Sequence, residues 1–232
     1  MSKVFSRKSS YGRGISMDTP ISGEMSAKSY NLTMTGVVFY GILVNAIMCS
    51  IIDPLEFFLN YNPITLFVAY IVLVIGGVVI NNFCKSAIAK FIGYNMVVLP
   101  IGVVISVAVF AVGGIDSPVV MGACYYTALI TAIMVIASYL FPNFFAKLGG
   151  VLLFSLITLL VVGILGRFIP ALYAGGIYSY ISACIFSLYI GFDVYRAQRF
   201  PKTVANAITA ALDIYLDIAN LFLDILRILS DR

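Results

Sequence analysis

The last apolar segment of the chain, residues 203–229, carries a row of polar side chains able to bind protons or cations. These residues are Asp213, Asp217, Asn220, Asp224 and Arg227. At about 100° per residue of an α-helix, they fall within an arc of about 80°. A carboxylate exposed to lipid at the bilayer centre costs at least about 2.5–3.5 kcal/mol. The spacing therefore predicts a helix at the centre of a bundle, with its polar face on a cavity or pore.

A further aspartate, Asp193, ends the apolar segment before it. The connection through Pro201 is short, so the two segments are expected to be adjacent and antiparallel. Simple hairpin geometry brings Asp193 closest to Asp213. Two carboxyls in contact do not readily both ionise, so one proton is shared. The protonated pair would tie the two helices together, and the deprotonated pair would separate and offer a doubly negative site to Ca²⁺.

Other interpretations of these residues remain open. The row could belong to an amphipathic helix lying on the membrane, but such helices favour basic polar faces, and this face is mainly acidic. Asp193 could cap its own helix or pair with a basic side chain. The candidate basic partners of the aspartates are Lys85, Arg196 and Arg227.

The composition predicts the elements that position these residues. Hydrophobic residues make up 62% of the 232, charged residues 10%, and the mean hydropathy is +1.05, whereas soluble domains carry about 25% charged residues. A bilayer-spanning helix needs about 20 apolar residues. Segments of this kind occupy residues 31–52, 63–81, 95–115, 118–140, 148–168, 170–192 and 203–229. The prediction is an all-α membrane protein: a flexible basic tail over residues 1–30, then a transmembrane domain of seven helices over residues 31–232.

The distribution of basic residues predicts the orientation. Most Lys and Arg residues fall in the tail and in those loops that share its side of the membrane. The positive-inside rule therefore places the N-terminus in the cytoplasm, and we expect a bacterial plasma (inner) membrane location. The C-terminus lies outside if segment 203–229 crosses fully, and inside if that segment is re-entrant.

The C-terminal sequence resembles the signature of the Bax inhibitor family, the transmembrane Bax-inhibitor-motif proteins. The resemblance covers about residues 186–229 and rests on Asp193-Val-Tyr-Arg-Ala-Gln and Ala-Leu-Asp213-Ile-Tyr-Leu-Asp217-Ile-Ala-Asn220-Leu-Phe-Leu. It implies six helices around a central seventh and a pH-sensitive calcium leak of the bacterial type. By motif position, the proton-sensing and Ca²⁺-binding pair would be Asp193 and Asp217. Asp213, Asn220 and Asp224 would be secondary pore or cation-site residues.

One departure from that family concerns the closed state. Some bacterial relatives carry a basic residue within the second span that pairs with the sensor. This chain has none there before Lys85, so its closed state is expected to be held differently.

Other functional classes find less support. The chain has no His, which excludes Ser-His hydrolysis and His-ligated zinc. Its cysteines form no CxxC pair, and the Gly-x-Gly-Asp motif of aspartyl intramembrane proteases is missing. We therefore expect no enzymatic activity, no cofactor and no nucleic-acid partner; the expected partners are the lipid bilayer, Ca²⁺ and protons. A proton-coupled secondary transporter and a non-conducting interaction partner in stress or cell-death control remain as alternatives.

Overall fold

The computed structural model describes residues 24–166, 168–169 and 176–231, and this part of the chain contains helices and no strand. The long helices are α1 (Ala27–Ile51), α3 (Pro63–Phe83), α4 (Ala87–Ala111), α5 (Pro118–Leu140), α7 (Gly149–Gly166), α8 (Ile177–Arg199) and α9 (Val204–Ser230). Two short helices, α2 (Pro54–Asn60) and α6 (Pro142–Phe145), lie in the connections. The predicted all-α fold is thus confirmed for the described residues.

Local sequence explains several helix starts. Asp53, Asn62 and Ser117 each cap a helix through the side-chain oxygen, and a proline follows at the first helical position. Proline suits that position because its fixed φ is helical and no backbone N–H is needed there. These Asp-Pro, Asn-Pro and Ser-Pro pairs therefore place the starts of α2, α3 and α5.

Several predicted boundaries differ from the structure. Helix α8 ends at Arg199 rather than at residue 192, so Asp193 lies within the helix and not at its end. Helix α4 begins at Ala87 rather than at residue 95, because the polar Lys90 lies buried inside the bundle instead of in a loop. Helix α1 begins at Ala27, within the predicted tail, where the Ser26 side chain caps it. Residues 1–23 of the predicted tail and residues 170–175 of the predicted sixth span lie outside the described residues.

Six of the described helices are long and apolar enough to cross a membrane: α1, α3, α4, α5, α7 and α8. Their outward faces expose large apolar side chains, such as Phe154 and Phe39, as expected for contact with lipid. The protein is therefore an integral membrane protein. Helix α9 is not among the six, although its 27 residues extend about 40 Å at ~1.5 Å per residue.

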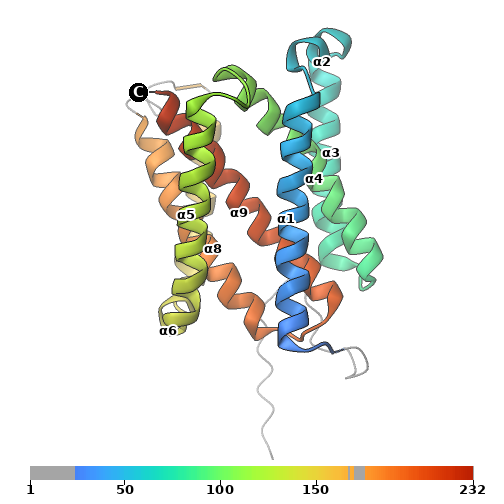
Figure 1. The fold of residues 1–232 in the computed structure, drawn as a ribbon, viewed down its shortest axis with the longest axis vertical. Helices are drawn as coiled ribbons and strands as arrows, with labels where there is room; N and C mark the ends of the chain where they lie inside the picture. Colours follow the sequence, from blue (N-terminus) through green and yellow to red (C-terminus); the bar gives the residue numbers. More distant parts are fainter. Residues whose placement is uncertain (1–23, 167, 170–175, 232) are drawn as a thin grey trace, which may run out of the picture.

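Helix α9 lies in the interior of the bundle. In Figure 1 it runs diagonally between α1 on one side and α5 and α8 on the other. Its residues are buried around the helix, with Ala207, Leu212, Tyr215 and Leu221 almost completely covered. The extensive contacts with α9 come from α1, α4, α5 and α8, whereas α3 packs mainly on α4 and α7 on α8. Of the six helices expected around α9, four are therefore close neighbours, whereas α3 and α7 make their main contacts with α4 and α8.

The start of α9 is held at the end of the bundle where α1 begins. The Met25 amide donates to the Lys202 carbonyl at 2.8 Å, and the Asn206 side chain donates to the Pro201 carbonyl at 2.9 Å. From this turn α9 continues without a break to the opposite end, where the chain ends (Figure 1). Helix α9 is thus one unbroken helix over Val204–Ser230, and its full crossing of the membrane stays a prediction.

Candidate functional site

Two aspartates meet between α8 and α9. Asp193 and Asp217 are 6% and 7% exposed, and their carboxyl groups lie within hydrogen-bonding reach of each other. Oδ2 of Asp217 is buried and accepts no hydrogen bond from the described residues. Oδ1 of Asp193 also accepts none, but it lies 3.3 Å from the Arg196 guanidinium. A proton held between the carboxyls would supply the donor that the Asp217 carboxyl lacks.

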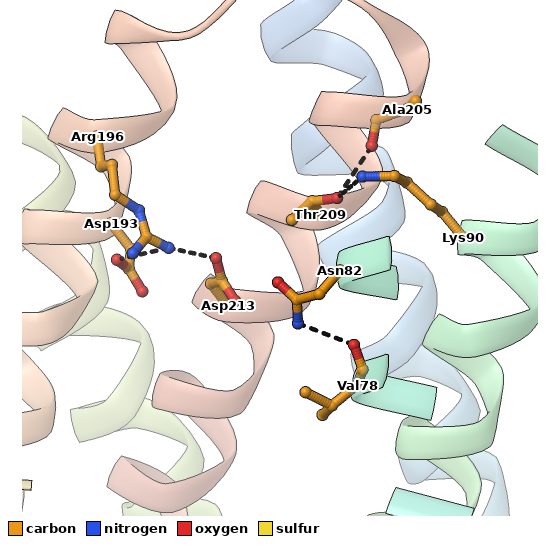
Figure 2. A network of polar contacts seen from close by, with 8 residues as sticks. All are labelled: Val78, Asn82, Lys90, Asp193, Arg196, Ala205, Thr209 and Asp213. Carbon is orange, nitrogen blue, oxygen red and sulfur yellow. Dashed lines mark hydrogen bonds and ion pairs between the residues drawn. The ribbon is translucent and has the colours of Figure 1, made fainter. Parts of the chain in front are cut away.

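Arg196 connects this pair to Asp213. Its guanidinium lies 3.3 Å from Asp193 on its own helix and forms an ion pair and hydrogen bond with Asp213 on α9. Figure 2 shows Arg196 between the two carboxyls. The structure therefore brings Asp193 together with Asp217 directly, whereas Asp213 meets Asp193 only through Arg196. The direct contact with Asp213 that hairpin geometry suggested is replaced by an ion pair, and the alternative pairing of Asp193 with a basic side chain is also present.

A second cation reaches α9 from the opposite side. The Lys90 side chain extends from α4, is 2% exposed, and donates to the Thr209 hydroxyl at 2.7 Å. Figure 2 shows Lys90 and Arg196 approaching α9 from different sides. Sequence reasoning missed Lys90 because it placed this residue in a loop. Lys85, which was a candidate partner, is exposed and forms no ion pair with these carboxyls in the described residues.

The polar face of α9 lines a cavity of about 960 Å³ that also borders α7 and α8. All the polar residues predicted from the last segment lie along it: Asp213, Asp217, Asn220, Asp224 and Arg227. We call the end at Asp193 and Asp213, near the α8–α9 turn, the inner end. The end at Ser179, Asp224 and Arg227 is the outer end. The volume is many times the ~30 Å³ of a water molecule in the liquid, so a hydrated cation fits.

The α8 wall of the cavity is also polar, and sequence reasoning identified only Asp193 and Arg196 on it. Its lining residues include Ser179, Ser182, Tyr189, Asp193 and Arg196. Their spacing of three, four or seven residues was the available signal, since it places them on one helical face. From Ser179 to Arg196 this face extends about 25 Å, close to the ~30 Å of a hydrocarbon core.

At the outer end Asp224 is 5% exposed, and the Ser182 hydroxyl lies within hydrogen-bonding reach of its carboxyl. Arg227 lies 3.5 Å from Asp224 and donates to the Ser179 hydroxyl at 3.4 Å. Arg227, which was predicted as a partner of the aspartates, thus pairs with Asp224 rather than with the Asp193–Asp217 pair.

The cavity offers a cation few protein ligands at any one point. Among the described residues, no group of three or more Cys, Asp or Glu side chains is arranged to hold a metal ion. Ca²⁺ takes six to eight oxygen ligands, so Asp193 and Asp217 would need water to complete its coordination. The donor set suits a hydrated, weakly held Ca²⁺ better than a dehydrated resident ion.

Comparisons with known proteins agree with the C-terminal signature. Residues 24–232 match the family described as "Inhibitor of apoptosis-promoting Bax1". An uncharacterised protein of Helicobacter pylori is 30% identical over 66% of this chain and 64% of its own length. A "BI1-like protein" of Arabidopsis thaliana is 35% identical over 50% of this chain and 48% of its own length. The matches thus span less than two thirds of these relatives. Because the family match covers nearly the whole chain, this protein belongs to the Bax inhibitor family.

Proposed function

We propose that the protein is a pH-sensitive calcium leak in which the Asp193–Asp217 pair is the gate. The observation that carries the proposal is the cavity along α8 and α9, bordered by five aspartates and two arginines. An excess of carboxylates along a polar path favours cations over anions. The N-terminus is proposed to be cytoplasmic, which places the inner end of the cavity at the cytoplasmic side.

The gate follows from the chemistry of the pair. With one shared proton, the two carboxyls hydrogen bond and hold α8 against α9. When the proton leaves, two buried negative charges repel each other, and separation of the helices opens the inner end. The sign of the pH dependence is therefore fixed: flux is low in acid and rises as the pH increases through the titration of the pair.

The test is Ca²⁺ influx into proteoliposomes between pH 5 and pH 8. Wild-type flux should rise with pH. Asp193→Asn and Asp217→Asn should each give low flux without pH dependence, because the amide donates to the remaining carboxylate as the shared proton did. Asp116→Asn is a matched control, since Asp116 is exposed and outside the cavity.

Two outcomes would contradict the proposal. An unchanged pH profile in both aspartate variants would show that the Asp193–Asp217 pair is not the gate. The absence of wild-type flux at every pH would show that the protein is not a calcium leak. Flux that requires an opposing proton gradient would instead favour a proton-coupled transporter, which uses the same carboxyls.

A further inference from the structure

We propose that the outer end of the cavity holds a second cation-binding site, centred on the Asp224 carboxylate, at which Arg227 is a tethered competing charge. The site extends the proposed leak and rests on it for its role in conduction. It is distinct from the Asp193–Asp217 pair in position and partners.

The Asp224 carboxylate has an oxygen available for a ligand. The residue is 5% exposed, lines the cavity, and its Oδ2 atom is buried and accepts no hydrogen bond from the described residues. Leaving a buried carboxylate oxygen without a donor is costly. A cation entering the cavity would remove that cost.

Neutral oxygen atoms surround this carboxylate. The Ser182 hydroxyl lies within hydrogen-bonding reach of the Asp224 carboxyl, and the Ser179 hydroxyl accepts from Arg227. Asn220, one helical turn before Asp224 on α9, lines the same cavity. The Asn220 amide nitrogen donates to the Leu216 carbonyl at 2.8 Å, which leaves its side-chain oxygen as an acceptor. One carboxylate with hydroxyl, amide and water oxygens is a suitable environment for hydrated Ca²⁺, which tolerates irregular coordination.

In the absence of a free cation, the Arg227 guanidinium occupies this site. Its guanidinium is 3.5 Å from Oδ1 of Asp224, and its side chain is 51% exposed. A partly solvated ion pair of this kind is weak, so a divalent cation can displace it. Arg227 would then turn toward the solvent at the end of α9.

The two ends of the cavity contain the same arrangement, an aspartate paired with the arginine three residues after it. Asp193 and Arg196 near the end of α8 repeat the spacing of Asp224 and Arg227 near the end of α9, with ion-pair distances of 3.3 and 3.5 Å. Because the helices are antiparallel, the two pairs lie at opposite ends. Asp217 and Asp224 are about 10 Å apart along α9, a separation at which ions at successive sites repel and exit is promoted.

The experiment measures Ca²⁺ binding to the purified full-length protein by isothermal titration, in an Asp217→Asn background that weakens the inner pair. Adding Asp224→Asn should weaken the remaining binding by about tenfold or more, because ligand charge sets Ca²⁺ affinity. Adding Arg227→Gln should tighten binding about three- to tenfold, because the competing charge is lost. Adding Asp116→Asn, an exposed aspartate outside the cavity, should change nothing.

The outcomes separate this site from the leak. Equal affinity with and without Asp224→Asn, no detectable binding in the Asp217→Asn background, or no tightening with Arg227→Gln would each overturn the second site. Because Arg227→Gln predicts a gain, damage to the fold does not imitate it. If proteoliposomes conduct Ca²⁺ but Asp224 does not affect binding, the protein is a leak without the second site. If binding depends on Asp224 but no flux is observed, the second site exists and the proposed leak is wrong.

Discussion

The net charge at the inner end of the cavity changes with a single proton. Arg196 pairs with Asp193 and Asp213, and Asp217 lies against Asp193. Lys90 reaches α9 from the other side and lies near enough to act on the charge of Asp213. With one proton shared by the aspartate pair, the carboxylate and cation charges of this group cancel, and loss of the proton leaves one uncompensated negative charge. Helix α3 supplies no basic residue, and the cations that compensate these carboxylates come instead from α8 and α4. The other polar neighbours, Tyr189 and Thr209, are neutral.

Arg196→Gln is predicted to shift the pH dependence of Ca²⁺ flux. A neighbouring cation favours the ionised form of a carboxyl, so removing Arg196 lets the pair keep its proton to higher pH. The midpoint of flux should move upward by about one pH unit or more, measured in proteoliposomes. Arg199→Gln is the control, because Arg199 lies on the same helix but is exposed and contacts the Tyr195 ring. A midpoint that is unmoved, or moved downward, would exclude this role for Arg196.

Small residues allow neighbouring helices to pack closely against each other. A Cβ atom added at Gly77 of α3 would lie 2.5 Å from the backbone oxygen of Gly93 on α4. A Cβ at Gly191 of α8 would lie 2.3 Å from the Phe145 ring carbon of α6. Membrane helices lack a hydrophobic drive to associate, so such close contact of backbones contributes to their packing. The α3–α4 hairpin therefore depends on glycine at residues 77 and 93.

Gly77→Ala is predicted to destabilise the protein by about 1–3 kcal/mol, because the added methyl forces two backbones apart. The measurement is thermal unfolding of the purified protein in detergent. Gly36→Ala in α1 is the control, since an added Cβ there has nothing within 4 Å. This variant should be neutral or more stable by up to about 1 kcal/mol. Equal stability of the two variants would show that the α3–α4 contact has room to adjust.

For the whole molecule, the central question is how the bundle sits in the membrane. The start of α1 and the turn before α9 share one end, and α9 ends at the other (Figure 1). Lys28, Lys85, Arg199 and Lys202 belong to the end where α1 begins, and Asp53, Glu56 and Asp116 belong to the connections at the opposite end. Under the positive-inside rule this asymmetry leads to the same prediction as the sequence, a cytoplasmic N-terminus.

The predicted orientation can be tested with single cysteines in a variant whose native cysteines are replaced by serine. With a membrane-impermeant maleimide on intact cells, a cysteine at Ser230 should be labelled, and one at Lys28 should react only after permeabilisation. Both positions are exposed at the ends of their helices. A cysteine at Asp116 is the control and should react like Ser230. Labelling of positions 28 and 230 from the same side would show that α9 does not cross.

Much of this protein was determined by local sequence. Hydropathy predicted seven apolar segments, and six of them are confirmed as helices long and apolar enough to span a membrane, since each must satisfy its backbone within the bilayer. The spacing of the polar residues from Asp213 to Arg227 predicted one polar face on α9. Only the tertiary structure decided which groups meet. Lys90 is polar and near a helix start, so sequence assigned it to solvent, whereas packing of α4 on α9 buries it against Thr209. Arg196 joins Asp193 to Asp213 because the crossing of α8 and α9 sets distances that no periodicity along one helix contains.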